Sequence, residues 1–193
     1  MSNKLILPNG TSQLVQPREE RAAPSMSSAE GTQSSFVVVD LADMKATNHP
    51  TGCLVTQSLG SCVAVAIFDP EARIGGLLNY ILPDSHICSE RAMTNPFLFA
   101  DTGIPLLFRR AYKLGALKER IVTKVAGAGN VLDPKENLRL GQQNYEALSR
   151  IMESNHVELK GKFVGGFKGM ALKMYLETGR VVVELGDGQE VEI

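Results

Sequence analysis

Short apolar runs recur along this chain and are separated by polar stretches that contain glycine or proline. Runs that are rich in β-branched residues and bounded in this way predict β-strands. The predicted strands cover residues 36–46 (a buried strand and its exit), 54–57, 63–68, 74–82, 121–126, 157–164, 171–176, 181–185 and 191–193. The run from Val63 to Phe68 has no polar alternation, which indicates a strand buried on both faces.

Two segments show the spacing of an amphipathic helix instead. One helix is predicted over residues 97–114, with Gly115 as its C-cap, and the other over residues 141–155. The apolar stripe of the first comprises Ile104, Leu107, Phe108, Ala111 and Leu114. The inner face of the second comprises Tyr145, Leu148, Ile151 and Met152. Residues 84–96 show no period and are expected to form an exposed loop.

The order of these elements favours the α+β class. Several of the seven to nine predicted strands follow one another without a helix between them, which argues against a pure βαβ arrangement. We expect a mixed β-sandwich, or sheet layers, flanked by the two main helices. Residues 1–35 are polar and lack a period, which predicts a disordered tail before a single domain at 36–193. Docking of that tail through residues 5–7 is the alternative.

Composition narrows the classes of partner. Lys and Arg together number 20 and Asp and Glu 21, for a formal net charge of -1, so the chain has no electrostatic footprint for nucleic acid. The apolar run at residues 5–7 is too short for a signal peptide or a membrane span. The three cysteines show neither paired disulfide spacing nor zinc-ligand spacing. We therefore expect a cytoplasmic protein with reduced thiols that uses no metal or cofactor and inserts into no membrane.

The chemistry-bearing feature of the sequence is Cys62, which stands where the polar turn Gly60-Ser61 gives way to an apolar strand. Glycine lets the chain turn tightly, and a strand fixes the direction of the side chain. A nucleophilic cysteine also needs a lowered pKa or an adjacent base. Without one, a cysteine at this point is more often a small core residue.

Other candidate motifs have simpler interpretations. His49, His86 and His156 stand in no recognisable catalytic setting, and we interpret them as surface or structural residues. The glycine-rich turn at residues 127–130 lacks the Lys-Ser/Thr of a phosphate-binding loop, so a tight turn after a strand is the better interpretation.

The segment TQSLGSCVAVAIFDPEARIGGLLNYILP at residues 56–83 resembles the CheD family, the chemoreceptor glutamine deamidases of bacterial and archaeal chemotaxis. The similarity extends from about residue 36 to the end of the chain. Further matching pieces are ADT-IPLL from residue 100, KVAGAGN from 124, Gly141 with Asn144 and Glu146-Ala147, Gly165-Gly166, and ETGRV from 177.

This resemblance implies an α/β sandwich similar to bacterial toxin deamidases. It also implies that Cys62 is the nucleophile and that Thr56 assists it. The family's catalytic histidine falls on Asn79, and an arginine that the family tends to have after Gly169 falls on Met170. The implied activity is hydrolysis of receptor glutamine side-chain amides to glutamate and ammonia through a Cys62 thioester.

The implied partners are the cytoplasmic helices of chemoreceptors and a CheC-like phosphatase. Because an asparagine amide has no useful pKa near neutrality, Asn79 leaves a second interpretation open. In it, the chain is a catalytically weak or silent member of the family that acts by binding the same partners.

Overall fold

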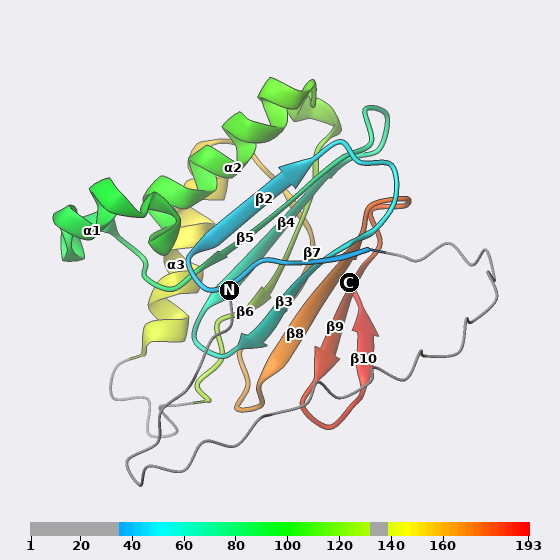
Figure 1. Cartoon of the computed structure of the whole chain (residues 1–193). Coiled ribbons are helices and arrows are strands. Elements are labelled where there is room, and N and C mark those ends of the chain that lie inside the picture. Colours follow the sequence, from blue (N-terminus) through cyan, green and yellow to red (C-terminus); the bar gives the residue numbers. More distant parts are fainter. Residues whose placement is uncertain (1–34, 132–138) are drawn as a thin grey trace, which may run out of the picture. The chain divides into compact units, whose positions relative to one another are not determined.

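The computed structural model describes residues 35–131 and 139–193, and almost all of the predicted N-terminal tail lies outside these ranges. Within them, ten strands form two five-stranded sheets (Figure 1). Sheet A has the order β1 (Phe36–Val38), β3 (Cys53–Leu59), β8 (Met170–Tyr175), β9 (Val181–Leu185) and β10 (Glu190–Glu192). Sheet B has the order β2 (Asp43–Thr47), β5 (Ile74–Tyr80), β4 (Val63–Asp69), β6 (Val122–Gly127) and β7 (Leu159–Val164).

Both sheets are mixed. The β1–β3 and β6–β7 pairs are parallel and the other pairs are antiparallel. The helices α2 (Ala100–Leu114) and α3 (Leu140–Ser154) cover the face of sheet B that is turned away from sheet A (Figure 1). This arrangement confirms the predicted α+β class, with two sheet layers and the two main helices outside them.

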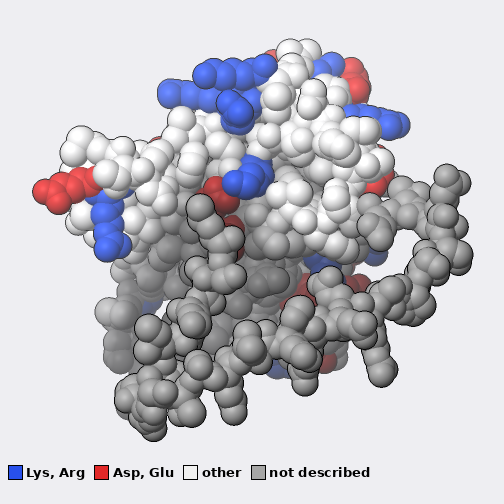
Figure 2. Space-filling model, viewed as in Figure 1, with Lys and Arg blue, Asp and Glu red and all other residues white. Residues whose placement is uncertain are grey.

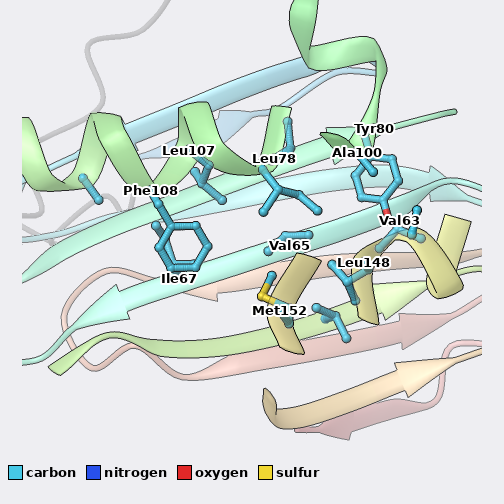
Figure 3. Close-up of a cluster of buried hydrophobic side chains, with 14 of the residues drawn as sticks. Val63, Val65, Ile67, Leu78, Tyr80, Ala100, Leu107, Phe108, Leu148 and Met152 are labelled. Atoms are coloured by element: carbon cyan, nitrogen blue, oxygen red, sulfur yellow. The ribbon is translucent and has the colours of Figure 1, made fainter. Parts of the chain in front are cut away.

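In the part of the chain that the structure describes, two apolar clusters hold the layers together. On the helix side, Leu107 and Phe108 of α2 and Leu148 of α3 pack onto residues of β4 and β5, such as Val65 and Leu78 (Figure 3). The second cluster lies between the sheets and joins β4, β5 and β6 to β3, β8 and β9. Strands β4 and β5 contribute to both clusters, which explains why every one of their residues is buried, as predicted for Val63 to Phe68.

The alternation along β5 decides which way its polar residue points. A Cβ added at Gly75 would meet side chains of Leu176 and Met174 on the sheet A side, whereas one at Gly76 would meet Leu107 of α2. Successive side chains of a strand point to opposite faces. Leu77 and Asn79 therefore face sheet A, between the two sheets.

Two sequence predictions were wrong. The run at residues 36–46 was predicted to be one buried strand and its exit, but it forms β1 and β2, which belong to different sheets. Phe36, Val37 and Val38 are exposed because, in the described structure, β1 is an edge strand that pairs with β3. The expected loop at 84–96 instead contains the 3-10 turn Ser85–Ile87 and the helix α1 (Ser89–Thr94).

These elements were missed because they are too short to show an apolar period. The 3-10 turn begins after the N-cap Asp84, whose side chain accepts a hydrogen bond from the backbone N–H of His86. Such a cap is not visible in the pattern of apolar residues. Two further 3-10 turns, Pro96–Leu98 and Lys118–Arg120, flank α2.

The surface carries charges of both signs. Figure 2 shows Lys and Arg side chains gathered in the upper part of the view, near the C-terminal end of α2, beside large neutral areas. No helix among the described residues is both long enough and apolar enough to cross a membrane.

Removing the Asp69 carboxylate is expected to destabilise the fold strongly. Asp69 is fully buried at the end of β4, where it accepts hydrogen bonds from the backbone N–H groups of Ala72 and Leu117 and from the Arg120 guanidinium. The change Asp69→Ala leaves these donors without their acceptor and is expected to cost about 3–5 kcal/mol in urea unfolding. Glu71→Ala, which removes a mostly exposed partner of the same arginine, is expected to cost less than about 1 kcal/mol.

The same carboxylate gives the stability a pH dependence. Burial alone would raise the pKa of Asp69, but the backbone N–H groups and Arg120 outweigh it and lower that pKa. A depressed folded-state pKa stabilises the protein above the unfolded pKa, and this contribution is lost as the pH falls through the lower folded value. Wild-type and Asp69→Ala proteins should therefore converge in stability in strong acid. A difference that stays constant down to that range would contradict this assignment.

Candidate active site at the Cys62 corner

Cys62 lies between the end of β3 and the start of β4, at a corner fixed by the glycine-rich turn at residues 127–130. Gly129 N–H donates to Gly60 O at 2.7 Å, and Ala128 N–H donates to Cys62 O at 2.8 Å. Gly127 has φ +114°, and a Cβ there would lie 2.2 Å from Cys62 O. The turn is the tight turn that the sequence predicts, and it also supports the cysteine corner, which the sequence did not reveal.

A second support comes from α3 and was missed by sequence reasoning. The Asn144 side chain is fully buried, and its Nδ2 donates to Ser61 O at 2.9 Å and to Ile81 O at 2.7 Å. The Tyr80 hydroxyl donates to Asn144 O at 2.8 Å. One signal could have identified Asn144: it is the polar member of a row, with Leu148 and Met152, that continues the inner face of the helix.

Cys62 lines a cavity of about 590 Å³. The corner residues 58–61 line it on one side, and residues 169–171 with 184–186 line it from sheet A. Leu41 and Val131 complete the lining. Cys62 is half-buried: it lines this cavity and also packs against the cluster between the sheets, while its backbone is held by the turn.

Asn79 lies on the inner face of sheet B. In the β4–β5 register it pairs with Ala64, two residues after Cys62, and Cys62 packs against the cluster between the sheets, which is the side that Asn79 faces. Asn79 is fully buried, and neither its Oδ1 nor its Nδ2 has a hydrogen-bond partner among the described residues. The structure thus places this unpaired amide on the same side of sheet B as the thiol.

Thr56 lies on the facing sheet. It pairs with Leu172, whose side chain is part of the cluster between the sheets, so Thr56 also points inward. Its side chain is fully buried, and its Oγ1 accepts from Leu172 N–H at 3.2 Å. Cys62, Asn79 and Thr56 therefore share the interior between the sheets, although neither Asn79 nor Thr56 lines the cavity.

The three histidines do not take part in this arrangement. The described lining of the Cys62 cavity contains no histidine. The His86 ring is highly exposed and bonds the Asp84 carboxylate at 2.6 Å, which raises the pKa of His86. The His49 ring is 2.8 Å from Thr51 O, and His156 follows α3 with φ 52°. Their interpretation as surface or structural residues agrees with these positions.

Among the described residues, one group of possible metal ligands lies away from the Cys62 cavity. Asp84, His86 and Asp101 bring one ligand atom each within 4.8 Å of the others. His86 is bonded to Asp84, and Asp101 accepts from the backbone N–H and the hydroxyl of Ser85. These bonds explain the grouping without an ion, so it does not indicate a metal centre.

The environment of the thiol keeps it protonated. Burial raises the pKa of Cys62, and the backbone N–H groups of Cys62 and Gly60 lower it by less, so the net shift is upward. The thiol also interacts with Tyr80: burial first, and then Cys62, raise the pKa of the Tyr80 hydroxyl. Among the residues that the structure describes, no cation lowers the pKa of Cys62.

Cys62 is therefore expected to react slowly with iodoacetamide at neutral pH. Since its pKa is raised, the thiolate fraction at pH 7 is smaller than that of a free cysteine, and the rate should still be rising at pH values where free cysteine has reached its plateau. Peptide mapping by mass spectrometry, which separates Cys62 from Cys53 and Cys88, measures this rate. If the Cys62 rate reached its plateau at a lower pH than the rate of free cysteine does, the raised pKa of Cys62 would be contradicted.

The sequence of this chain is similar to those of known proteins. A family model described as "CheD chemotactic sensory transduction" matches residues 81–185. The chain is 41% identical over 152 residues to "Probable chemoreceptor glutamine deamidase CheD 1" of Syntrophus aciditrophicus, which covers 79% of this chain and 95% of that protein. It is 41% identical to "Probable chemoreceptor glutamine deamidase CheD 2" of Anaeromyxobacter dehalogenans, over 79% of this chain and 96% of the relative. It is 31% identical to "Chemoreceptor glutamine deamidase CheD" of Thermotoga maritima, over 81% and 96%.

Proposed function

The chain belongs to the CheD family, and from this premise we propose that it is a deamidase of chemoreceptor glutamines with Cys62 as its nucleophile. The observation that carries the proposal is the position of Cys62, on a corner held by backbone hydrogen bonds and open to a cavity of about 590 Å³. A receptor glutamine side chain is small enough to enter such a cavity. The names of the relatives favour this activity over a silent binding module.

In the first half-reaction the Cys62 sulfur attacks the side-chain amide carbon of glutamine. A carbon–sulfur bond forms, the carbonyl oxygen becomes an oxyanion, and collapse of this intermediate breaks the carbon–nitrogen bond. Ammonia leaves with the proton that the thiol has lost, and a γ-glutamyl thioester remains on Cys62. The backbone N–H groups of Cys62 and Gly60, which interact with the sulfur, are the proposed donors to the oxyanion.

In the second half-reaction water attacks the thioester carbonyl. The carbon–sulfur bond breaks, the oxygen of water stays on the carbon as the carboxylate of glutamate, and the thiol regains a proton. Thr56 stands on the facing strand with its hydroxyl bound to Leu172 N–H, and its role here is to hold that wall of the interior. The proposed product is a receptor that carries glutamate in place of glutamine.

Both half-reactions move a proton, and Asn79 limits how fast they do so. Where the family has a histidine, this chain presents an amide that neither accepts nor releases a proton near neutrality. Besides Cys62, the titratable side chain among the described lining residues is Glu184, and its carboxylate is paired with Lys173 at 2.6 Å. Water is therefore the proton carrier in this proposal, which makes the enzyme a slow deamidase.

The test is incubation with the cytoplasmic fragment of a chemoreceptor, followed by mass spectrometry of its peptides. The proposal predicts conversion of specific glutamines to glutamate by the wild-type protein, and none by Cys62→Ala. Binding of the fragment without any conversion at long times would overturn the deamidase and support the silent module.

The resemblance also supports two finer proposals. A CheC-like phosphatase is a further proposed partner, and co-purification of the two proteins tests it. A likeness to bacterial toxin deamidases is proposed for the sandwich around Cys62, and superposition on such enzymes tests whether their nucleophiles coincide with Cys62.

A further inference from the structure

The side chain of Asn144 joins three parts of the site from the opposite face of sheet B. It belongs to α3, and its Nδ2 donates to the carbonyl oxygen of Ser61, just before the nucleophile, and to that of Ile81, just after β5. Two carbonyl acceptors fix which end of the amide is nitrogen, since an oxygen there would face two oxygens. The Oδ1 of Asn144 is buried without a partner among the described residues, so the donor end alone accounts for its side-chain hydrogen bonding.

The hydrogen bond to Ser61 O sets the direction of the next backbone N–H. All peptide bonds of the described residues are trans, so the Ser61 C=O and the Cys62 N–H point in opposite directions across one rigid plane. Asn144 holds the C=O towards α3, and the N–H of Cys62 is therefore turned away from α3. The Cys62 side chain lies on that same side, against the cluster between the sheets.

We infer that Asn144 is a positioning residue, which holds the Cys62 backbone N–H in the direction needed for an oxyanion donor. This inference rests on the proposed function for the identity of the oxyanion, whereas the orientation of the N–H group stands on the geometry alone. A donor that is already oriented costs no reorganisation when charge develops on the substrate oxygen.

The surroundings of Asn144 give the amide little freedom. The Tyr80 hydroxyl holds its backbone carbonyl at 2.8 Å. The start of α3 lies directly on the turn at 127–130, since a Cβ at Gly141 would come within 2.5 Å of Ala128 O. Helix, turn and strand end thus fix the Ser61–Cys62 peptide from three directions. The lowering effect of the Cys62 N–H on the pKa of its own thiol, smaller than the effect of burial, is consistent with this direction.

The rate of Cys62 alkylation by iodoacetamide at a fixed, mildly alkaline pH tests the inference, because that reaction needs a thiolate but no deamidase activity. In Asn144→Ala the peptide is free to turn, and the thiolate loses a hydrogen bond from a correctly oriented N–H. We expect alkylation to slow by about tenfold, because loss of this hydrogen bond to the charged thiolate raises the pKa of Cys62 further. A merely structural role predicts the opposite sign, since loosening around a half-buried thiol exposes it and accelerates alkylation.

Two further variants keep the test decisive. Asn144→Ser retains one short donor and serves if the alanine variant does not fold; we expect it to slow alkylation less. Leu148→Val, one turn further along the same buried face, perturbs α3 without touching the corner and should not slow alkylation. Unchanged or faster alkylation in folded Asn144 variants, or equal slowing in Leu148→Val, would overturn the inference.

The failure of this inference is distinguishable from the failure of the proposed function. Slower alkylation in the Asn144 variants supports the orientation of the N–H group even if no receptor glutamine is converted. If deamidation depends on Cys62 but Asn144→Ala leaves its kcat unchanged, then Asn144 has no role in the mechanism. The proposed deamidase activity would still stand.

Discussion

Replacement of Asn79 by histidine is expected to increase the rate of receptor deamidation by about 10²–10⁴-fold, the range that a well-placed general acid–base contributes. Asn79 faces the interior between the sheets, its register partner Ala64 is two residues from Cys62, and its side chain has no hydrogen-bond partner among the described residues. An imidazole at this position would take the thiol proton and deliver it to the departing ammonia. The measurement is the initial rate of glutamate formation in a receptor fragment at neutral pH.

The matched control for this variant is Asn79→Gln. Glutamine also enlarges the side chain but adds no titratable group, so its rate should stay near that of the wild type. Iodoacetamide should also react faster with Cys62 in the histidine variant than in the glutamine variant. If a folded Asn79→His protein deamidates no faster than Asn79→Gln, then Asn79 does not limit the reaction.

Replacement of Cys62 by alanine is expected to reduce deamidation by about 10³-fold or more, since loss of the attacking group is among the most damaging changes an enzyme can suffer. The change removes one sulfur atom from a half-buried position at the cavity and leaves the backbone bonds of the corner in place. Receptor binding and thermal stability should therefore change little while the chemistry stops. Mass spectrometry of the receptor peptides measures the loss.

Cys88→Ser is the control for nonspecific effects of thiol removal. Cys88 is also half-buried, but it lies before α1 and does not line the Cys62 cavity. Its activity should match that of the wild type. Comparable losses in both cysteine variants would indicate damage to the fold and not removal of the nucleophile.

Much of the fold is visible in the sequence because its strands are buried on one or both faces. The run at 63–68 predicted β4, and the stripe from Ile104 to Ala111 predicted α2, since each pattern reports directly on burial. The exposed state of β1 could not be predicted in the same way, because edge position is set by pairing with β3 and not by the apolar residues of β1 itself. The short helix α1 has no period long enough to be detected.

The site residues also differ in how far the sequence could identify them. Cys62 was found from its local corner, and Asn79 and Thr56 were found from a family resemblance; their burial on facing inner surfaces required the structure. Asn144 was missed because its function depends on a contact with Ser61, 83 positions away. In the sequence, such a contact is indicated only by an asparagine on an otherwise apolar helix face.

The covalent intermediate tests the account most directly. After rapid acid quenching of enzyme and receptor fragment, intact-mass spectrometry should detect an adduct equal to the two proteins minus ammonia. Digestion should place the link between Cys62 and a receptor glutamine side chain. Conversion of receptor glutamines by Cys62→Ala at the wild-type rate, with no such adduct in the wild type, would contradict the assignment of Cys62 as nucleophile.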